Sequence, residues 1–249
     1  MSYRILLAGA SGAVGKRLIP LLVDAGHFVT GTTRSQTRAE ELRRLGADPA
    51  VVDVFDADAL ARAALAARPD VVIHQLTDLP PGLDPSRMAA AVVGNARIRD
   101  EGTRNLIRAA IAAGARRLVA QSIAWAYAPG PEPHGEDDPL DAGAEGTRAI
   151  SMNGVIALER QVLASRPLDG IVLRYGQLYG PGTGADAPTG AAPLHVDAAA
   201  FAAFLAIDRG SPGAFNVAEP NRQVTVEKAT RELGWRADFR LPARSEKAS

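Results

Sequence analysis

Three glycines near the N-terminus have the spacing of a phosphate-binding turn. Gly9, Gly12 and Gly15 follow the apolar run 5–8, and an apolar helical pattern begins directly after them. The first glycine permits a tight turn, the second lets backbone approach a pyrophosphate, and the third lets the helix pack close to its strand. Free N–H groups at the helix start bind phosphate oxygens. We predict a dinucleotide site formed by Gly9, Ser11, Gly12, Ala13, Val14 and Gly15; the alternative is a glycine-rich turn without a ligand.

The end of the next expected strand, 27–33, bears on the choice of cofactor. About twenty residues beyond the glycines, where an acid would bind the ribose of NAD, the chain has Thr33, Arg34 and Ser35. A guanidinium is planar and matches the oxygens of a 2′-phosphate. We therefore predict NADP as the cofactor, with NAD less favoured. The alternative interpretation of Arg34 is a solvated surface arginine.

Strands and helices alternate along the chain. We expect strands near 3–8, 27–33, 49–53, 70–75, 116–122 and 170–175, and helices near 13–25, 36–45, 56–67, 86–113, 145–165 and 196–208. This alternation predicts an α/β fold, a Rossmann-type doubly wound parallel sheet. We expect residues 1–170 to form the dinucleotide-binding core, and residues 171–249 to complete the sheet and form a small, reduced C-terminal substrate subdomain.

Ligands of such sheets bind beyond the carboxyl ends of the strands. The residues at those ends extend the predicted cofactor site, which then includes Asp53, Val54, Gln75, Leu76, Tyr175 and Tyr179. For Asp53, capping of a turn is an equally good interpretation.

Composition limits the classes of partner. The chain has 249 residues, of which 47% are hydrophobic, and 28 basic side chains balance 28 acidic ones. This length and hydrophobic content suit one large α/β domain, and the absence of a basic tract excludes the usual nucleic-acid footprint. With no cysteine, disulfides and zinc–thiolate sites are excluded. We expect no contact with membranes and a cytoplasmic location, because no leader and no apolar run of membrane length occur.

Several segments, in order along the chain, carry a family resemblance. GASGAVG at 9–15, EGTRNLIRAA at 101–110, LRYGQLYGPGT at 173–183, GAFNVAEP at 213–220 and ELGWRAD at 232–238 resemble an extended short-chain dehydrogenase/reductase of the NAD-dependent epimerase/dehydratase type. The resemblance implies a dinucleotide cofactor. It also implies a homodimer formed through the two long helices expected at 86–113 and 145–165.

The catalytic positions of that family are altered in this chain. The family has an asparagine, a serine or threonine, and a tyrosine followed four residues later by a lysine. The resemblance places these stations on Arg99, Ile123, Asn153 and Ala157. No tyrosine anywhere in the chain is followed by a lysine four residues later, so a shifted Tyr-x-x-x-Lys pair is also excluded.

Reduction of a ketone by hydride needs a proton donor near the developing alkoxide. The candidates are Ser122, Tyr127, Asn153 and His74, of which we favour Tyr127 because it follows the fifth strand. Ser122 would point to the opposite face of a regular strand, and a packed neutral imidazole is the alternative for His74. No histidine pair has ligand spacing such as H-x-x-x-H, so we predict no metal site.

The segment between Gly182 and His195 is short and lacks the basic residues that would bind a nucleotide-sugar diphosphate. We therefore predict an NADP(H)-dependent oxidoreductase that reduces a carbonyl or oxidises an alcohol of a small metabolite with a non-standard proton donor. A non-redox enzyme on the same scaffold, such as a cyclase, dehydratase or isomerase, and a non-catalytic NADP(H) sensor are the alternatives, because fold alone does not decide function.

Overall fold

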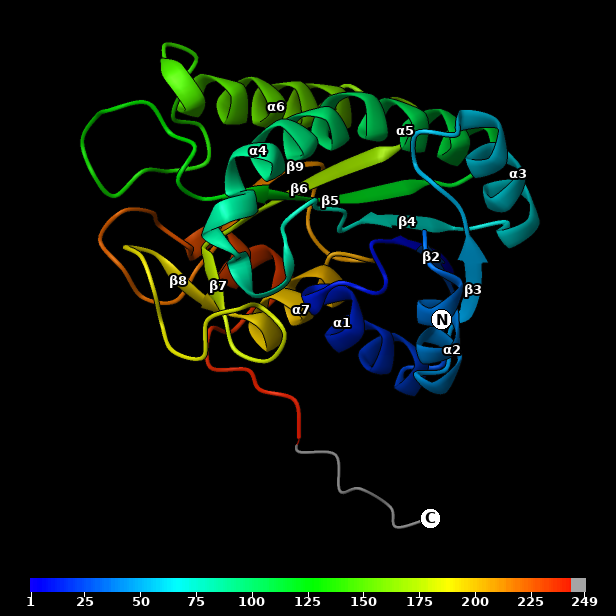
Figure 1. The fold of residues 1–249 in the computed structure, drawn as a ribbon. Helices are drawn as coiled ribbons and strands as arrows, with labels where there is room; N and C mark the ends of the chain where they lie inside the picture. Colours follow the sequence, from blue (N-terminus) through cyan, green and yellow to red (C-terminus); the bar gives the residue numbers. More distant parts are fainter. Residues whose placement is uncertain (243–249) are drawn as a thin grey trace.

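The computed structural model describes residues 1–242 and shows a parallel sheet between two layers of helices (Figure 1). The strands of the main sheet lie in the order β3-β2-β1-β4-β5-β6-β9, and every neighbouring pair is parallel. Their bounds are Arg4–Ala8 (β1), Phe28–Thr33 (β2), Asp48–Val51 (β3), Val71–His74 (β4), Arg117–Ile123 (β5), Asp169–Tyr175 (β6) and Gly213–Val217 (β9). The predicted doubly wound Rossmann-type fold is confirmed.

Helices connect these strands by crossing over the two faces of the sheet. They are α1 (Ala13–Asp24), α2 (Gln36–Arg44), α3 (Ala57–Ala67), α4 (Met88–Arg97), α5 (Thr103–Ala112), α6 (Gly146–Leu163) and α7 (Val196–Leu205). In Figure 1, α3, α4, α5 and α6 lie above the sheet, and α1, α2 and α7 lie below it. Among residues 1–242, no helix is both long and apolar enough to cross a membrane.

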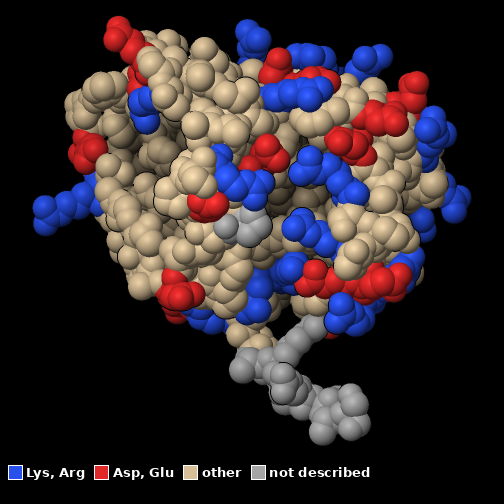
Figure 2. Space-filling model, in the orientation of Figure 1, with Lys and Arg blue, Asp and Glu red and all other residues tan. Residues whose placement is uncertain are grey.

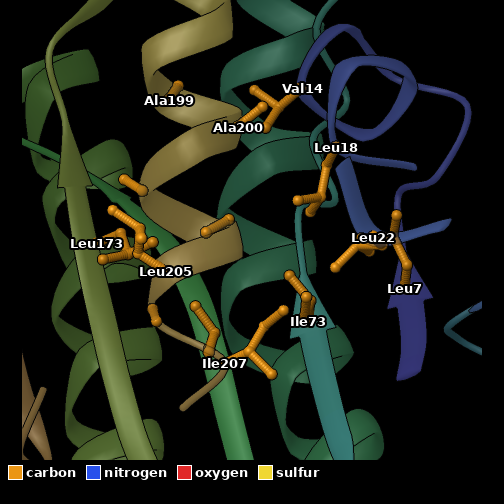
Figure 3. Packing of buried hydrophobic residues seen from close by; sticks show 14 of the residues in the cluster. Leu7, Val14, Leu18, Leu22, Ile73, Leu173, Ala199, Ala200, Leu205 and Ile207 are labelled. Carbon is orange, nitrogen blue, oxygen red and sulfur yellow. The ribbon is translucent and has the colours of Figure 1, made fainter. Parts of the chain in front are cut away.

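The sheet is buried on both faces because successive strand residues point in opposite directions. Leu7 and Ile73 pack against α1 and α7 in the larger core, which Figure 3 shows from close by. Leu6 and Val72, their neighbours in sequence, belong to the second core beneath α3, α5 and α6. The two cores hold the carboxyl ends of all the central strands at one edge of the sheet.

The strand order reverses direction at β1, which pairs with β2 on one side and with β4 on the other. Ala8, the last residue of β1, lies opposite His74, the last residue of β4. The connections leaving β1 and β4 depart to opposite faces, so a crevice opens between them. In open α/β sheets this crevice binds the ligand.

The expected helix 86–113 is interrupted, in contrast to the prediction. Between α4 and α5, Ile98–Gly102 forms a π-helical turn. A π turn adds one residue without ending the helix, so the apolar pattern still reads as one continuous helix.

Three strands were not predicted. β9 forms an edge of the main sheet, and β7 (Gln177–Tyr179) and β8 (Pro193–His195) form a separate two-stranded parallel sheet. β6 and β9 place part of the segment 171–249 in the main sheet. The division of the chain at residue 170 stays a prediction.

The face that would form the predicted homodimer is built by α4 and α6, which pack against each other. Val93 on α4 and Ile150 on α6 expose large apolar side chains. The homodimer and the cytoplasmic location stay predictions.

Candidate active site

The glycine turn has the geometry of a dinucleotide cradle. Gly9 has φ +86°, and a Cβ added there would lie 2.5 Å from the carbonyl carbon of Gln75. A Cβ on Gly15 would lie 2.4 Å from the carbonyl oxygen of Gly9. Side chains are therefore excluded at both positions, by close packing between β1, β4 and α1.

The N-terminus of α1 is open for a phosphate. Gly12 is its exposed N-cap residue and has no side-chain cap, so no side chain competes for the first N–H groups of the helix. Ser11 and Ala13 are half-buried beside it, and Val14 packs into the core. Since helix N-termini bind anions, these residues fit the pyrophosphate of a dinucleotide.

The turn after β2 exposes the side chain of Arg34 and uses those of Thr33 and Ser35 in local hydrogen bonds. The hydroxyl oxygen of Thr33 accepts a hydrogen bond from the backbone N–H of Ser35 (3.2 Å), and Ser35 caps the N-terminus of α2. Both therefore shape the turn. The Arg34 side chain is 62% exposed, and its guanidinium lies 3.6 Å from the carboxylate of Asp78, which comes from the segment after β4.

Asp53 and Val54 stabilise the segment between β3 and α3. The Asp53 carboxylate accepts a hydrogen bond from the backbone N–H of Phe55 (3.0 Å), which is the turn-capping alternative. Val54 is buried, and its carbonyl accepts a hydrogen bond from Asn105 on α5 (3.0 Å). Leu76 donates its backbone N–H to His74 (3.2 Å).

The hydroxyls of Tyr175 and Tyr179 are engaged inside the protein. Tyr175 donates to the carbonyl of Ala199 (3.0 Å), and burial raises the pKa of Tyr175. Gln75 donates to the same hydroxyl (3.4 Å), and its Oε1 is the buried side-chain atom without a partner among residues 1–242. Tyr179 donates to Glu219 (2.7 Å), and burial raises its pKa as well.

His74 is held as a neutral, packed imidazole. Its Nδ1 accepts the backbone N–H of Leu76, so Nε2 carries the proton and donates to the hydroxyl of Thr103 (3.1 Å). Burial, with a smaller effect from the charge of Arg99, lowers the pKa of His74 to about 4. The geometry therefore favours the packed neutral imidazole, and a role of His74 as an acid stays a prediction.

Ser122 and Tyr127 belong to a buried network behind the crevice. Ser122 donates to the Glu159 carboxylate (2.6 Å), and Tyr127 donates to the side-chain oxygen of Asn216 (2.6 Å). The Tyr127 hydroxyl also accepts a hydrogen bond from Arg174 (2.7 Å), and burial is the main cause that raises its pKa. Both hydroxyls therefore donate to partners within the core, and their role as proton donors stays a prediction.

The centre of this network is an ion pair that the sequence analysis missed. Two nitrogens of Arg174 on β6 contact the Glu159 carboxylate on α6, the shortest at 2.7 Å, and the two side chains are 5% and 4% exposed. Arg174 also donates to the carbonyl of Glu136 (3.0 Å). Two signals were available: a charged residue inside the apolar strand 171–175, and another on the buried face of a helix.

Helix α6 supplies no proton donor of the family type. Its sequence, GTRAISMNGVIALERQVL, contains neither tyrosine nor lysine, so no register of the helix restores the pair. Asn153 is exposed, and the adjacent Gly154 packs against α4, where a Cβ would lie 2.8 Å from the Cα of Ala96. The structure therefore does not bring Asn153 together with Ser122 or Tyr127 in one buried network.

A cavity of about 520 Å³ opens beyond the carboxyl end of β5. Its lining residues include Trp125, Pro129, His134 and Arg148. The imidazole of His134 stacks on Tyr127 with ring centroids 4.8 Å apart. The cavity is within the size range of small-molecule sites.

The face of the molecule drawn in Figure 2 is hollowed near its middle, with Lys and Arg as well as Asp and Glu side chains around the hollow.

Metal chemistry has no side-chain set to support it here. Within the described part of the chain, no group of three or more His, Asp or Glu side chains could hold a metal ion.

Known proteins resemble this chain in sequence and in fold. The profile of the NAD(P)H-binding family matches residues 9–198. A 3-diazoavenalumate denitrifying reductase from a Streptomyces species is 41% identical over a 274-residue alignment that covers 93% of this chain and 88% of the relative.

Two solved structures have the same fold at low sequence identity. The UDP-glucose 4-epimerase of Thermotoga maritima with UDP-glucose has a TM-score of 0.75 at 19% identity and covers 96% of this chain and 94% of that one. WbmG of Bordetella bronchiseptica in complex with NAD and UDP has a TM-score of 0.70 at 20% identity and covers 97% and 91%.

These matches confirm the predicted nucleotide-binding oxidoreductase and leave the choice between NAD and NADP undecided. The chain belongs to the NAD(P)H-binding family, as an oxidoreductase that shares the fold of the UDP-glucose 4-epimerase and lacks the Tyr-x-x-x-Lys pair.

Proposed function

We propose that this protein is an NADPH-dependent reductase that replaces the diazo group of a small organic compound with hydrogen and releases dinitrogen. The observation that carries the proposal is that the family's proton donor is missing: α6 has no tyrosine or lysine, and Ser122, Tyr127 and His74 donate hydrogen bonds within the core. The similarity to a denitrifying reductase over nearly the whole chain supports the same chemistry.

A carbonyl and a diazonium differ in what their reduction requires. Addition of hydride to a carbonyl leaves an alkoxide, which needs a proton donor in the site. Bound NADPH would supply a hydride, and a diazonium that accepts it forms one carbon–hydrogen bond, loses its carbon–nitrogen bond and releases N₂, with no proton consumed. Loss of the tyrosine and lysine is therefore compatible with catalysis on this substrate class.

The protein's own residues would bind and orient the reactants. The glycine turn and the open N-terminus of α1 fit the pyrophosphate. Arg34, with a side chain that is 62% exposed, is suited to bind the 2′-phosphate that distinguishes NADP from NAD, which would replace its contact with Asp78 at 3.6 Å. The cavity beyond β5, with Trp125 and Pro129 in its wall, would hold an aromatic ring and restrict water.

The test is a tracer experiment with purified protein, 4-carboxybenzenediazonium and NADPH deuterated at the transferred position. We expect loss of absorbance at 340 nm, release of dinitrogen and benzoate with one deuterium at the former diazo carbon. The matched reaction in D₂O with unlabelled NADPH should give benzoate without deuterium.

Two outcomes would contradict the proposal. One is a rate no greater than that of NADPH and the diazonium without protein. The other is deuterium that enters the product from solvent, since this would require a proton donor. Turnover of carbonyl compounds in place of the diazonium would instead support the carbonyl reductase predicted from the sequence.

A further inference from the structure

Arg99 lies on the π-helical turn that interrupts the helix between β4 and α5. Thr103, four residues later, contacts His74 at the carboxyl end of β4. Residues four apart lie on nearly the same face of a helix. The helix runs back along the sheet after β4, so Arg99 lies one turn beyond the strand end, on the side of the crevice.

Arg99 has no anionic partner within the described chain. No ion pair or hydrogen bond of its guanidinium is formed with residues 1–242, and Glu159 is the acid whose charge acts on its pKa. The oxygens of Glu159 already accept hydrogen bonds from Ser122 and Arg174. The charge of Glu159 raises the pKa of Arg99, but Glu159 forms no hydrogen bond or ion pair with it.

Arg99 keeps its positive charge although its side chain is partly buried. Arg99 is half-buried, and burial lowers its pKa to about 10, which still leaves the guanidinium protonated at neutral pH. A partly buried charge without a counterion raises the free energy of the protein. An anion that binds to it offsets part of this desolvation cost. π turns inside helices often coincide with functional sites.

We propose that Arg99 binds an oxyanion of the substrate, a carboxylate or a phenolate, next to the reacting carbon. This inference rests on the proposed function, since it assigns an anionic aromatic class to the diazo substrate. The planar guanidinium can donate two parallel hydrogen bonds to a carboxylate or one to a phenolate. In either case Arg99 would hold the anionic group of the substrate at the carboxyl edge of the sheet, and no proton leaves the protein.

The test measures binding without turnover, by calorimetry on the NADPH-loaded protein. The probes share one ring: 4-nitrobenzoate, neutral 4-nitrobenzamide, and 4-nitrophenol at a pH at which its hydroxyl is ionised. We expect at least one anion to bind the wild-type protein at least tenfold more tightly than the amide. Tighter binding of 4-nitrobenzoate than of ionised 4-nitrophenol would indicate that the substrate's oxyanion is a carboxylate. The opposite order would indicate a phenolate.

In Arg99→Gln the anion should bind at least tenfold more weakly, while binding of the amide stays unchanged. Arg99→Lys should restore part of the affinity, because it keeps the charge and loses the planar fork. The matched control is Arg104→Gln, which removes an exposed guanidinium paired with Asp100 from the same helix and should change nothing.

Equal affinity of wild-type protein for the amide and both anions would overturn the assignment, as would an anion affinity that survives Arg99→Gln. The comparison among probes needs no variant, so it holds even if Arg99→Gln does not fold. Failure of the diazonium assay with anion binding intact would refute the proposed reaction and leave this site standing.

Discussion

The buried ion pair between Glu159 and Arg174 should stabilise the fold and not take part in hydride transfer. In Glu159→Gln, the guanidinium of Arg174 stays buried and loses its counterion. Removing one partner of such a pair costs about 3–5 kcal/mol. The structure supports this range because Glu159 accepts hydrogen bonds from both Ser122 and Arg174, and both members of the pair are almost fully buried.

The assay is urea unfolding followed by the fluorescence of the fully buried Trp235. In thermal unfolding, the expected loss of unfolding free energy corresponds to a melting temperature lower by roughly 6–20 °C for a chain of this size. The control is Glu40→Gln, which breaks an ion pair with Arg43 whose side chains are 65% and 51% exposed. Exposed pairs contribute about 0–1 kcal/mol, so this variant should unfold close to the wild type.

A double variant tests whether the instability of the single variants comes from an unpaired buried charge. Glu159→Leu combined with Arg174→Met replaces both charges with apolar side chains, and such replacements are often neutral or stabilising. We expect the double variant to be more stable than either single variant. A loss of less than about 1 kcal/mol of unfolding free energy in Glu159→Gln, which is the range of an exposed pair, would contradict a stabilising role of the buried pair.

Three further predictions concern the candidate site. Tyr127→Phe and Ser122→Ala should each lose about 1–3 kcal/mol of unfolding free energy, because buried partners lose hydrogen bonds, while turnover per folded molecule changes less than about threefold. A large loss of turnover at unchanged stability would restore either residue as a proton donor. Arg34→Ala should weaken NADPH binding about tenfold to a hundredfold, as expected for hydrogen bonds to a charged group, and leave NADH binding unchanged in a nicotinamide fluorescence titration; equal weakening of both nucleotides would contradict a 2′-phosphate contact. His74 has a pKa lowered from 6.5 to about 4, so its contribution to stability is complete above pH 6.5 and is lost as the pH falls to 4, where the loss reaches about 3 kcal/mol. Urea unfolding across this pH range should therefore show a shallower decline for His74→Asn than for the wild type, and parallel declines would contradict a buried neutral imidazole.

Much of the fold was predictable from local patterns. Gly9 and Gly15 must be glycine because β4 and the turn itself leave no space for a Cβ, and this requirement is visible as their spacing in the sequence. The apolar runs of β1, β4 and β5 are buried on both faces, so their positions were also visible. β9 was missed because Gly213–Val217 is short and begins with two small residues.

The candidate site was predictable only in part. The glycine turn and Arg34 are local features, since each depends on one strand end and the residues that follow it. The partners of Ser122 and Tyr127 are 37 and 89 residues away in sequence. Such pairs depend on the packing of α6 and on the pairing of β5 with β6 and of β6 with β9, which no local pattern encodes.

By itself the sequence determined that a dinucleotide could bind and that the usual tyrosine and lysine are missing, because both depend on residue types at fixed spacing. The tertiary structure alone decided that Ser122, Tyr127 and His74 are buried and hydrogen-bonded, since their partners are distant in sequence. It also decided that Arg99 forms no ion pair with residues 1–242, because the oxygens of Glu159 contact Arg174.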